Sequence, residues 1–150
     1  MRATMIKHRT PRAWLEAGRA VPLPTAISDA FDDHVAALPW AGTTGLDWSR
    51  MPPSREFNVV GKSPAEVYAW VKATGLGHRG HIAVWYSRKE GGVIVPLRAG
   101  AEALDEFYWD APGPRFAFGA EVQGDAVQPF FADILQYGYG DLLVATAPLS

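Results

Sequence analysis

A glycine-rich segment near the middle of the chain has the spacing of a known binding motif. Gly75, Gly77 and Gly80 match the G-x-G-x-x-G pattern with which dinucleotide-binding proteins hold a pyrophosphate. Such a site needs a strand before the glycines and a helix after them, so that the helix N-terminus faces the anion. Here we expect a helix before the glycines and a strand over residues 82–86 after them. The order of elements argues against a dinucleotide site, and we predict that Gly75 ends the helix in a left-handed conformation.

The same segment contains two histidines and an arginine that could bind an anion. A guanidinium group at Arg79 and the amides of a glycine-rich loop can hold a phosphate or a carboxylate. His78 and His81 could also divide acid and base work or share a metal, but no H-E-x-x-H pattern or acidic neighbour completes a metal site. We therefore predict no metal and no cofactor. An anion site at His78, Arg79 and His81 is one hypothesis, and a connector with exposed histidines is the alternative.

Charge is distributed unevenly along a chain whose formal net charge is −2. Residues 1–19 contain five basic residues and one acidic residue, whereas residues 99–150 contain eight acidic residues and one basic residue. Because phosphates are bound by lysine and arginine, we expect no nucleic acid as a partner of the acidic third. A basic protein partner would suit it, since complementary fields speed and select association. The alternative is an acidic face that maintains solubility.

One group of residues within the acidic third has the composition of a protein interface. Asp105, Glu106, Tyr108, Trp109 and Asp110 combine carboxylates with two aromatic types that often anchor interfaces. The carboxylates could also supply the pair that a glycosidase needs, although acidic residues about a helix end are typical of a solvated surface. The chain has no cysteine, and no serine lies in a G-x-S-x-G elbow. We therefore predict no catalytic residue and assign these five residues to partner binding.

The pattern of apolar residues predicts an α+β fold with a mixed or antiparallel sheet of about five strands and several helices. A length of 150 residues suits a single domain over residues 1–150. Ser63 to Glu66 has the pattern of a capping box at a helix start. Residues 88–92 read as a hairpin turn between two strands. We expect helices over 10–17, 25–37, 64–74, 99–108 and 125–136, and strands over 56–60, 82–87, 93–97, 115–122 and 142–145.

A segment over about residues 20–50 resembles a known family. Leu23-Pro24, a helix carrying Ile27, Phe31 and His34, and a glycine-containing loop to Leu46-Asp47-Trp48 together resemble the opening of SUKH-superfamily proteins. Many of those proteins are immunity proteins that neutralise bacterial toxins. The resemblance covers about residues 20–50. It implies a toxin-immunity function and assigns no site residue.

These observations favour a cytoplasmic bacterial inhibitor of the immunity or antitoxin type, which would cover a basic toxin domain. Residues 1–19 have no apolar run followed by a cleavage site, so we expect no signal peptide. No stretch approaches the ~20 apolar residues that span a bilayer, so we expect no membrane partner. Two other hypotheses stay open. One is a small ligand-binding or enzymatic domain that uses the His78-Arg79-His81 loop for an anionic ligand, and the other is a homo-oligomeric structural subunit, for example of viral origin.

Overall fold

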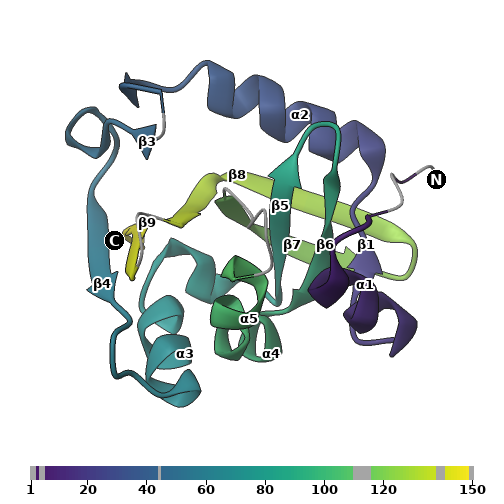
Figure 1. Ribbon diagram of the computed structural model, residues 1–150. Helices are drawn as coiled ribbons and strands as arrows, with labels where there is room; N and C mark the ends of the chain where they lie inside the picture. Colours follow the sequence, from purple (N-terminus) through teal and green to yellow (C-terminus); the bar gives the residue numbers. More distant parts are fainter. Residues whose placement is uncertain (1–2, 4–5, 44, 110–115, 138–140, 149–150) are drawn as a thin grey trace.

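The computed structural model describes residues 3, 6–43, 45–109, 116–137 and 141–148 (Figure 1). Within these residues, seven strands form an antiparallel sheet at the centre of the molecule, which confirms the predicted α+β class. Strands β1 and β8 are the two that the sequence does not predict. In spatial order the sheet contains β1 (Val21–Pro22), β6 (Gly91–Pro96), β5 (His81–Ser87), β7 (Phe116–Gln123), β8 (Ala126–Tyr137), β9 (Leu142–Thr146) and β4 (Ser54–Asn58).

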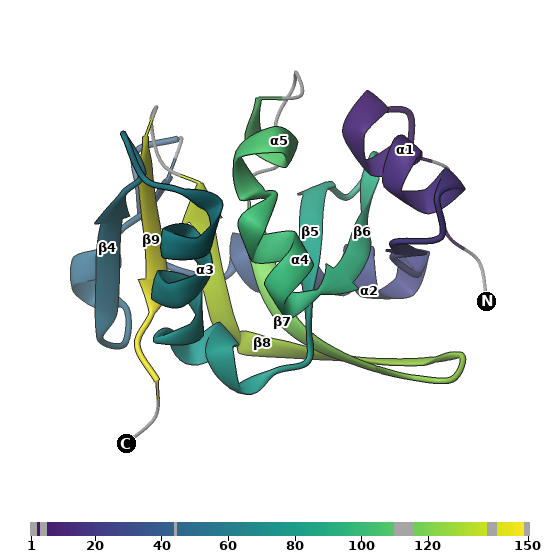
Figure 2. The same cartoon turned by 90° about the horizontal axis from the view of Figure 1, so that it is seen from below.

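Helices cover both faces of this sheet (Figure 2). One face is covered by α1 (Arg9–Glu16), α3 (Pro64–Lys72), α4 (Leu97–Glu102) and α5 (Leu104–Tyr108). The other is covered by α2 (Thr25–Ala36), by a small hairpin of β2 (Trp40–Ala41) and β3 (Gly45–Leu46), and by the 3-10 turn η1 (Trp48–Arg50). A second 3-10 turn, η2 (Gly75–His78), joins α3 to β5. Four predicted helical segments are thus confirmed, the segment 99–108 as two short helices that meet at Ala103.

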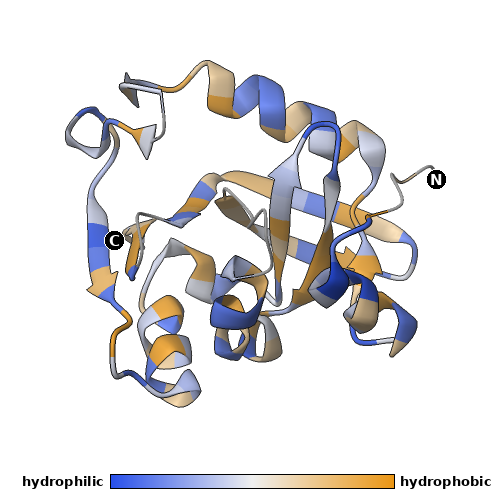
Figure 3. Ribbon diagram, viewed as in Figure 1, coloured by the Kyte–Doolittle hydropathy of each residue, from blue (hydrophilic) through white to orange (hydrophobic). Residues whose placement is uncertain are grey.

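The central strands are buried on both faces, and their alternating side chains build two cores. Along β5, Ile82, Val84 and Tyr86 pack with the helices of the α3 side, whereas Ala83 and Trp85 pack with α2. Trp85 is 0% exposed, so this tryptophan belongs to the core and not to a binding surface. Figure 3 shows hydrophobic residues along the strands and hydrophilic residues at the turn between β5 and β6.

Local signals in the sequence fix the ends of two elements as predicted. The Ser63 hydroxyl accepts from the Glu66 N–H at 3.2 Å, and the Glu66 carboxylate accepts from the Ser63 N–H at 3.3 Å. The hairpin between β5 and β6 closes through Gly91, whose φ of +75° favours glycine. The capping residues therefore determine where α3 begins, and the turn glycine determines where the chain reverses between β5 and β6.

Residues 125–136 were predicted to be helical but form strand β8. Gly124, with φ of +61°, and Asp125 make a two-residue turn from β7 into β8, and a Gly-Asp pair is typical of such turns. Between Phe130 and Ile134 the strand bulges against β7, which interrupts its alternation. Beyond the bulge, β8 is buried on both faces. Consecutive residues of β8 are therefore apolar, and this pattern has the spacing expected of a buried helix. For this reason the predicted helix over residues 125–136 was wrong.

Candidate functional site

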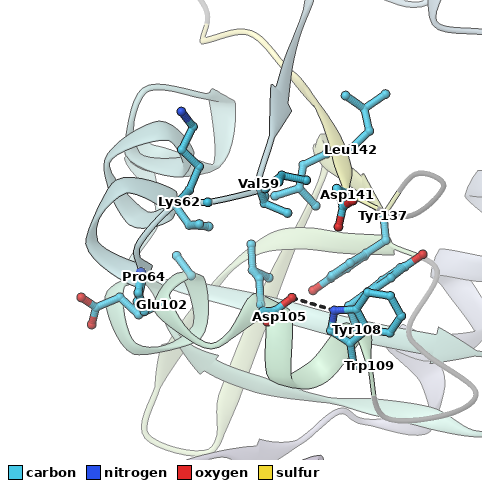
Figure 4. A pocket seen from close by; sticks show the side chains of 16 residues that line it. Val59, Lys62, Pro64, Glu102, Asp105, Tyr108, Trp109, Tyr137, Asp141 and Leu142 are labelled. Carbon is cyan, nitrogen blue, oxygen red and sulfur yellow. Dashed lines mark hydrogen bonds between the residues drawn. The ribbon is translucent and has the colours of Figure 1, made fainter.

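A cavity of about 480 Å³ lies between helices α3 and α5 and the edge of the sheet at β4 and β9 (Figure 4). One wall is the connection from β4 to α3, a second is α4 with α5, and a third is the end of β8 with the start of β9. These parts are far apart in the sequence and meet because β9 pairs with both β8 and β4. The lining consists of residues 59–62, 64, 67, 101, 102, 104, 105, 108, 109, 137 and 141–143.

Helix α5 supplies acidic and aromatic side chains to the cavity. Leu104 and Phe107 are buried in the core, and this burial fixes the orientation of the helix. Asp105, Tyr108 and Trp109 are three and four residues apart, so they share the side of the helix that borders the cavity. The Trp109 indole N–H donates to Asp105 Oδ1 at 2.8 Å. This bond holds the indole beside the carboxylate.

Aromatic rings form one side of the cavity. Tyr108 and Tyr137 stack with ring centroids 5.6 Å apart and planes at 7°, and Tyr108 meets Trp109 edge to face at 5.2 Å. Tyr137 is 8% exposed, and its hydroxyl is buried without a hydrogen-bond partner among the described residues. Burial, with a smaller contribution from Tyr86, raises the pKa of Tyr137 well above its ordinary value of 10.0. The hydroxyl therefore stays neutral at physiological pH.

The ionisable side chains in the lining are mainly carboxylates. Glu102, Asp105 and Asp141 line the cavity together with Lys62. The Glu102 carboxylate lies 3.8 Å from Arg98 Nε, and the Lys62 side chain extends away from the cavity in Figure 4. Within the part of the chain that the structure describes, neither Asp105 nor Asp141 has a basic group at ion-pair distance. The cavity thus presents two carboxylates that a cation could bind.

Two exposed apolar side chains border the same cavity. Val60 is 62% exposed and Trp109 is 63% exposed. Among the described residues, Val21 is the one other large apolar side chain that is exposed, and it is 40% exposed. Single exposed apolar residues are common on proteins, but a pair at the mouth of a cavity is typical of a binding surface. The apolar rim and the acidic lining occupy one place on the molecule.

The structure brings together three of the five residues predicted to bind a partner. Asp105, Tyr108 and Trp109 line the cavity. Glu106 is exposed on α5 but does not line it, and Asp110 lies outside the described residues. The predicted cluster on α5 is therefore one wall of a larger site.

Sequence reasoning does not identify Val60, Tyr137 or Asp141 as site residues. Asp141 contributes to the acidic excess of residues 99–150, but nothing in its own neighbourhood marks it. Tyr137 ends β8, a strand that the sequence predicts as a helix. Val60 follows β4, and an exposed valine has no pattern of its own. These residues join the site through strand pairing over long distances in the chain, which no local signal reports.

The predicted anion-binding loop lies elsewhere, at η2 and the start of β5. Arg79 Nε donates to Asp133 Oδ2 at 2.7 Å, and the Arg79 guanidinium lies 3.5 Å from the centre of the Phe130 ring. The Gly80 N–H donates to Glu121 Oε1 at 2.7 Å. The donors expected to hold an external anion thus bind carboxylates of the chain itself. An external anion would have to displace them.

The two histidines of this loop lie in different surroundings. His78 is exposed, whereas His81 is half-buried, and its Nδ1 atom has no hydrogen-bond partner among the described side chains and backbone. In the described ranges, no group of three or more His, Asp or Glu side chains could hold a metal ion. An anion site at His78, Arg79 and His81 stays a prediction. The geometry gives more support to the cavity beside α5.

The three glycines of the G-x-G-x-x-G pattern have close neighbours, although the neighbour of Gly80 is the flexible end of a side chain. A Cβ atom on Gly77 would lie 1.9 Å from the Lys72 carbonyl oxygen, and one on Gly80 would lie 2.7 Å from Glu121 Oε1. A Cβ atom on Gly75 would lie 3.0 Å from a threonine hydroxyl of β9. Gly75 has no positive φ and α3 ends before it, so the predicted left-handed helix end is wrong. These glycines let η2 pack tightly against its neighbours.

No helix in the described ranges is both long enough and apolar enough to cross a membrane. Comparisons of the chain with protein-family models, with curated proteins and with solved structures find no match. We therefore infer function from the residues that build the cavity.

Proposed function

We propose that the chain is a protein-binding inhibitor of the immunity or antitoxin type, which acts in the bacterial cytoplasm. It would cover a basic protein domain with the acidic and aromatic surface around the cavity. The observation that carries this proposal is Trp109, a tryptophan that is 63% exposed and hydrogen-bonded to Asp105 at the mouth of a cavity with an acidic lining. The resemblance of residues 20–50 to SUKH proteins supports the same class of function.

The apolar rim and the carboxylates would contribute to binding in different ways. Burial of Trp109 and Val60 against a partner would remove two exposed apolar side chains from water, and tryptophans in such positions often contribute about 2 kcal/mol or more to affinity. Asp105, Glu106 and Asp141 would favour a basic partner and speed its approach. An inhibitor that acts by occlusion needs such a surface and no catalytic group.

The proposal is tested by binding to the product of the neighbouring gene, because immunity genes normally adjoin the gene of their toxin. We expect the two purified proteins to form a complex whose dissociation constant is measured by isothermal titration calorimetry. Trp109→Ala should weaken the complex by about thirtyfold, the equivalent of 2 kcal/mol. The double variant Asp105→Lys, Glu106→Lys should weaken it further, because it places like charges against a basic surface.

A matched control reverses charge elsewhere on the molecule. Asp33 lies on α2, on the opposite face of the sheet, with its side chain 75% exposed, and Asp125 lies in the exposed turn between β7 and β8. The double variant Asp33→Lys, Asp125→Lys makes the same change in net charge and should leave the dissociation constant within about threefold. Equal weakening by both double variants, or no complex with the wild-type chain, would contradict the proposed function.

A further inference from the structure

The inner wall of the cavity contains a polar atom that the protein itself leaves unpaired. Tyr137 is 8% exposed, and its hydroxyl is buried with no hydrogen-bond partner in the described part of the chain. In Figure 4 the hydroxyl points into the cavity, on the side of Asp105. A buried hydroxyl without a partner is unfavourable, because it has lost its bonds to water. A ligand that moves the covering side chains aside and brings a donor to this atom would remove that cost.

Two carboxylates stand at the same cavity from different elements. Asp105 comes from α5 and already accepts one bond from Trp109, and Asp141 comes from the turn just before β9. Among the described residues neither has a basic partner, and Lys62 extends away from the cavity. The cavity therefore contains three acceptor groups from three places in the chain: a hydroxyl on β8, a carboxylate on α5 and a carboxylate in the turn before β9. They fit a compact group with several donors and a positive charge.

The remaining walls fit an apolar stem. Val59, Leu104 and Leu142 line the cavity, and the rings of Tyr108 and Trp109 form its aromatic side. An aliphatic chain can lie against these side chains while its charged end reaches the carboxylates, and aromatic faces also attract a cation. A volume of about 480 Å³ has room for such a side chain.

We infer that the cavity is a lysine-binding site, which receives one lysine side chain of the basic partner. This inference rests on the proposed function and names the group by which the partner is recognised. An ammonium group has three donors that radiate from one atom, and here three acceptors come from separate walls. A guanidinium group is planar and pairs best with a single carboxylate in a fork, so the arrangement favours lysine over arginine.

The probe for this site is Nα-acetyl-lysine N-methylamide, titrated into the full chain and followed by two-dimensional amide NMR. We expect saturable shifts at the amides of Val60, Leu104 and Leu142, with a dissociation constant on the order of 1 mM. The Nε-acetylated probe has the same stem without the charge and should not bind. The matching arginine probe should bind at least about threefold more weakly than the lysine probe.

Two conservative variants test the acceptors. Tyr137→Phe keeps the ring stacked on Tyr108 and removes the hydroxyl, and Asp141→Asn keeps the shape and removes the charge. Each should weaken the lysine probe by about threefold or more. Tyr68→Phe on α3 and Asp125→Asn are the controls outside the lining and should leave its affinity unchanged. If Tyr137→Phe does not fold, two other results test the lysine site. Asp141→Asn should weaken binding of the lysine probe, and added salt should lower the affinity of the wild-type chain for this probe.

Failure of this inference can be told apart from failure of the proposed function. Three results would overturn the lysine site. They are no amide shifts with the lysine probe, equal shifts with the Nε-acetylated probe, and unchanged shifts in both acceptor variants. The complex with the neighbouring gene product and its charge-reversal variants would still decide the proposed function. Conversely, binding of the lysine probe without any protein complex would support the site and contradict the inhibitor function.

Discussion

At the scale of single residues, the backbone at the end of α3 leaves no room for a side chain at position 77, so this residue is a glycine. A Cβ atom there would lie 1.9 Å from the Lys72 carbonyl oxygen, and the last turn of α3 cannot move away without losing its own hydrogen bonds. Lys72 Nζ also donates to the Gly77 carbonyl at 3.0 Å, which closes the turn. We predict that Gly77→Ala lowers the free energy of unfolding by about 3 kcal/mol, measured by urea denaturation.

Gly80→Ala is the matched control for this prediction. Its Cβ atom would meet the end of the Glu121 side chain, which is flexible and can turn away. The loss should be about 1 kcal/mol, the value of the hydrogen bond from the Gly80 N–H to Glu121. Equal losses in the two variants would show that the backbone contact does not explain the glycine at position 77.

His34 gives the stability of the protein a dependence on pH. It lies on α2 beside Phe131, with ring centroids 5.3 Å apart, and burial lowers its pKa below the ordinary value of 6.5. As pH falls through 6.5, the unfolded chain takes up a proton before the folded chain does, so the unfolded state is favoured. This contribution of neutral His34 to stability is present above pH 6.5 and is lost as pH falls toward the folded-state pKa.

The measurement compares urea unfolding from pH 7.5 to pH 5 in His34→Gln and in the wild type. We expect the variant to lose less stability over this range than the wild type does. The comparison uses the slope with pH and not the stability itself, because glutamine also changes the packing against Phe131. Gln123→Asn, an exposed position without an ionisable group, is the control and should keep the wild-type slope. Identical slopes for all three proteins would contradict the prediction.

At the scale of elements, the bulge in β8 brings Asp133 to Arg79. The two side chains are bonded at 2.7 Å over Gly119, where a Cβ atom would lie 2.8 Å from Arg79 Cγ and 3.1 Å from Asp133 Cβ. We predict that Asp133→Ala destabilises the protein by about 2 kcal/mol, because it leaves a partly buried guanidinium unpaired. The Arg79 side chain is 29% exposed, so solvent keeps the loss below that of a fully buried pair.

Thermal unfolding of two variants measures this contribution. Asp133→Asn keeps an acceptor for Arg79 and should lose less than Asp133→Ala does. A loss in Asp133→Ala that is within error of zero would mean that the ion pair does not stabilise the bulge. Arg79 would then keep its contact with the Phe130 ring alone, and the hypothesis of an external anion at this loop would gain support.

Elements whose ends are set by neighbouring residues, such as a capping box or a turn glycine, could be predicted from the sequence. Elements that depend on contacts between distant parts of the chain could not. The capping box of Ser63 and the hairpin around Gly91 involve neighbours in the chain, so their residues indicate them directly. Strand β8 depends on a bulge against β7 and on burial from both sides, and its Gly124-Asp125 turn was the one local signal that could have identified it. A Pro-containing strand of two residues such as β1 exists because β6 pairs with it.

The same distinction applies to the candidate site. Asp105, Tyr108 and Trp109 could be selected from composition, since they lie within five consecutive residues at the end of α5. Tyr137 and Asp141 could not, because the pairing of β8 with β9 and of β9 with β4 places them opposite α5. The sequence could therefore indicate an acidic and aromatic surface, but it could not indicate a cavity behind that surface.

At the scale of the whole molecule, one sheet separates two cores and links them. Trp85 and Phe118 pack toward α2, whereas Val84 and Ala117 pack toward α3 and α5 from the same two strands. If a strand loses its packing against one core, it also shifts relative to the other core, because its alternate side chains belong to both. We therefore expect the two cores to unfold together, although they lie on opposite faces of the sheet.

Phe31 tests this coupling from the side opposite the cavity. It is 0% exposed, stacks on Phe118 at 4.0 Å and meets Trp85 edge to face at 6.2 Å. We predict that Phe31→Ala lowers the free energy of unfolding by about 4 kcal/mol, the usual cost of removing a buried ring. Because the cores are coupled, amide hydrogen exchange should show that protection falls by the same amount in β5 and in α3.

Val60→Ala is the control, since Val60 is 62% exposed and its truncation should change stability by less than about 0.5 kcal/mol. If exchange in Phe31→Ala accelerates in α2 alone, then α2 opens as a unit of its own and the cores are independent. If protection falls equally in β5 and α3, the α3 wall of the cavity opens only when the whole molecule unfolds. A partner would then meet a preformed site beside α5, and binding would not have to compensate for ordering it.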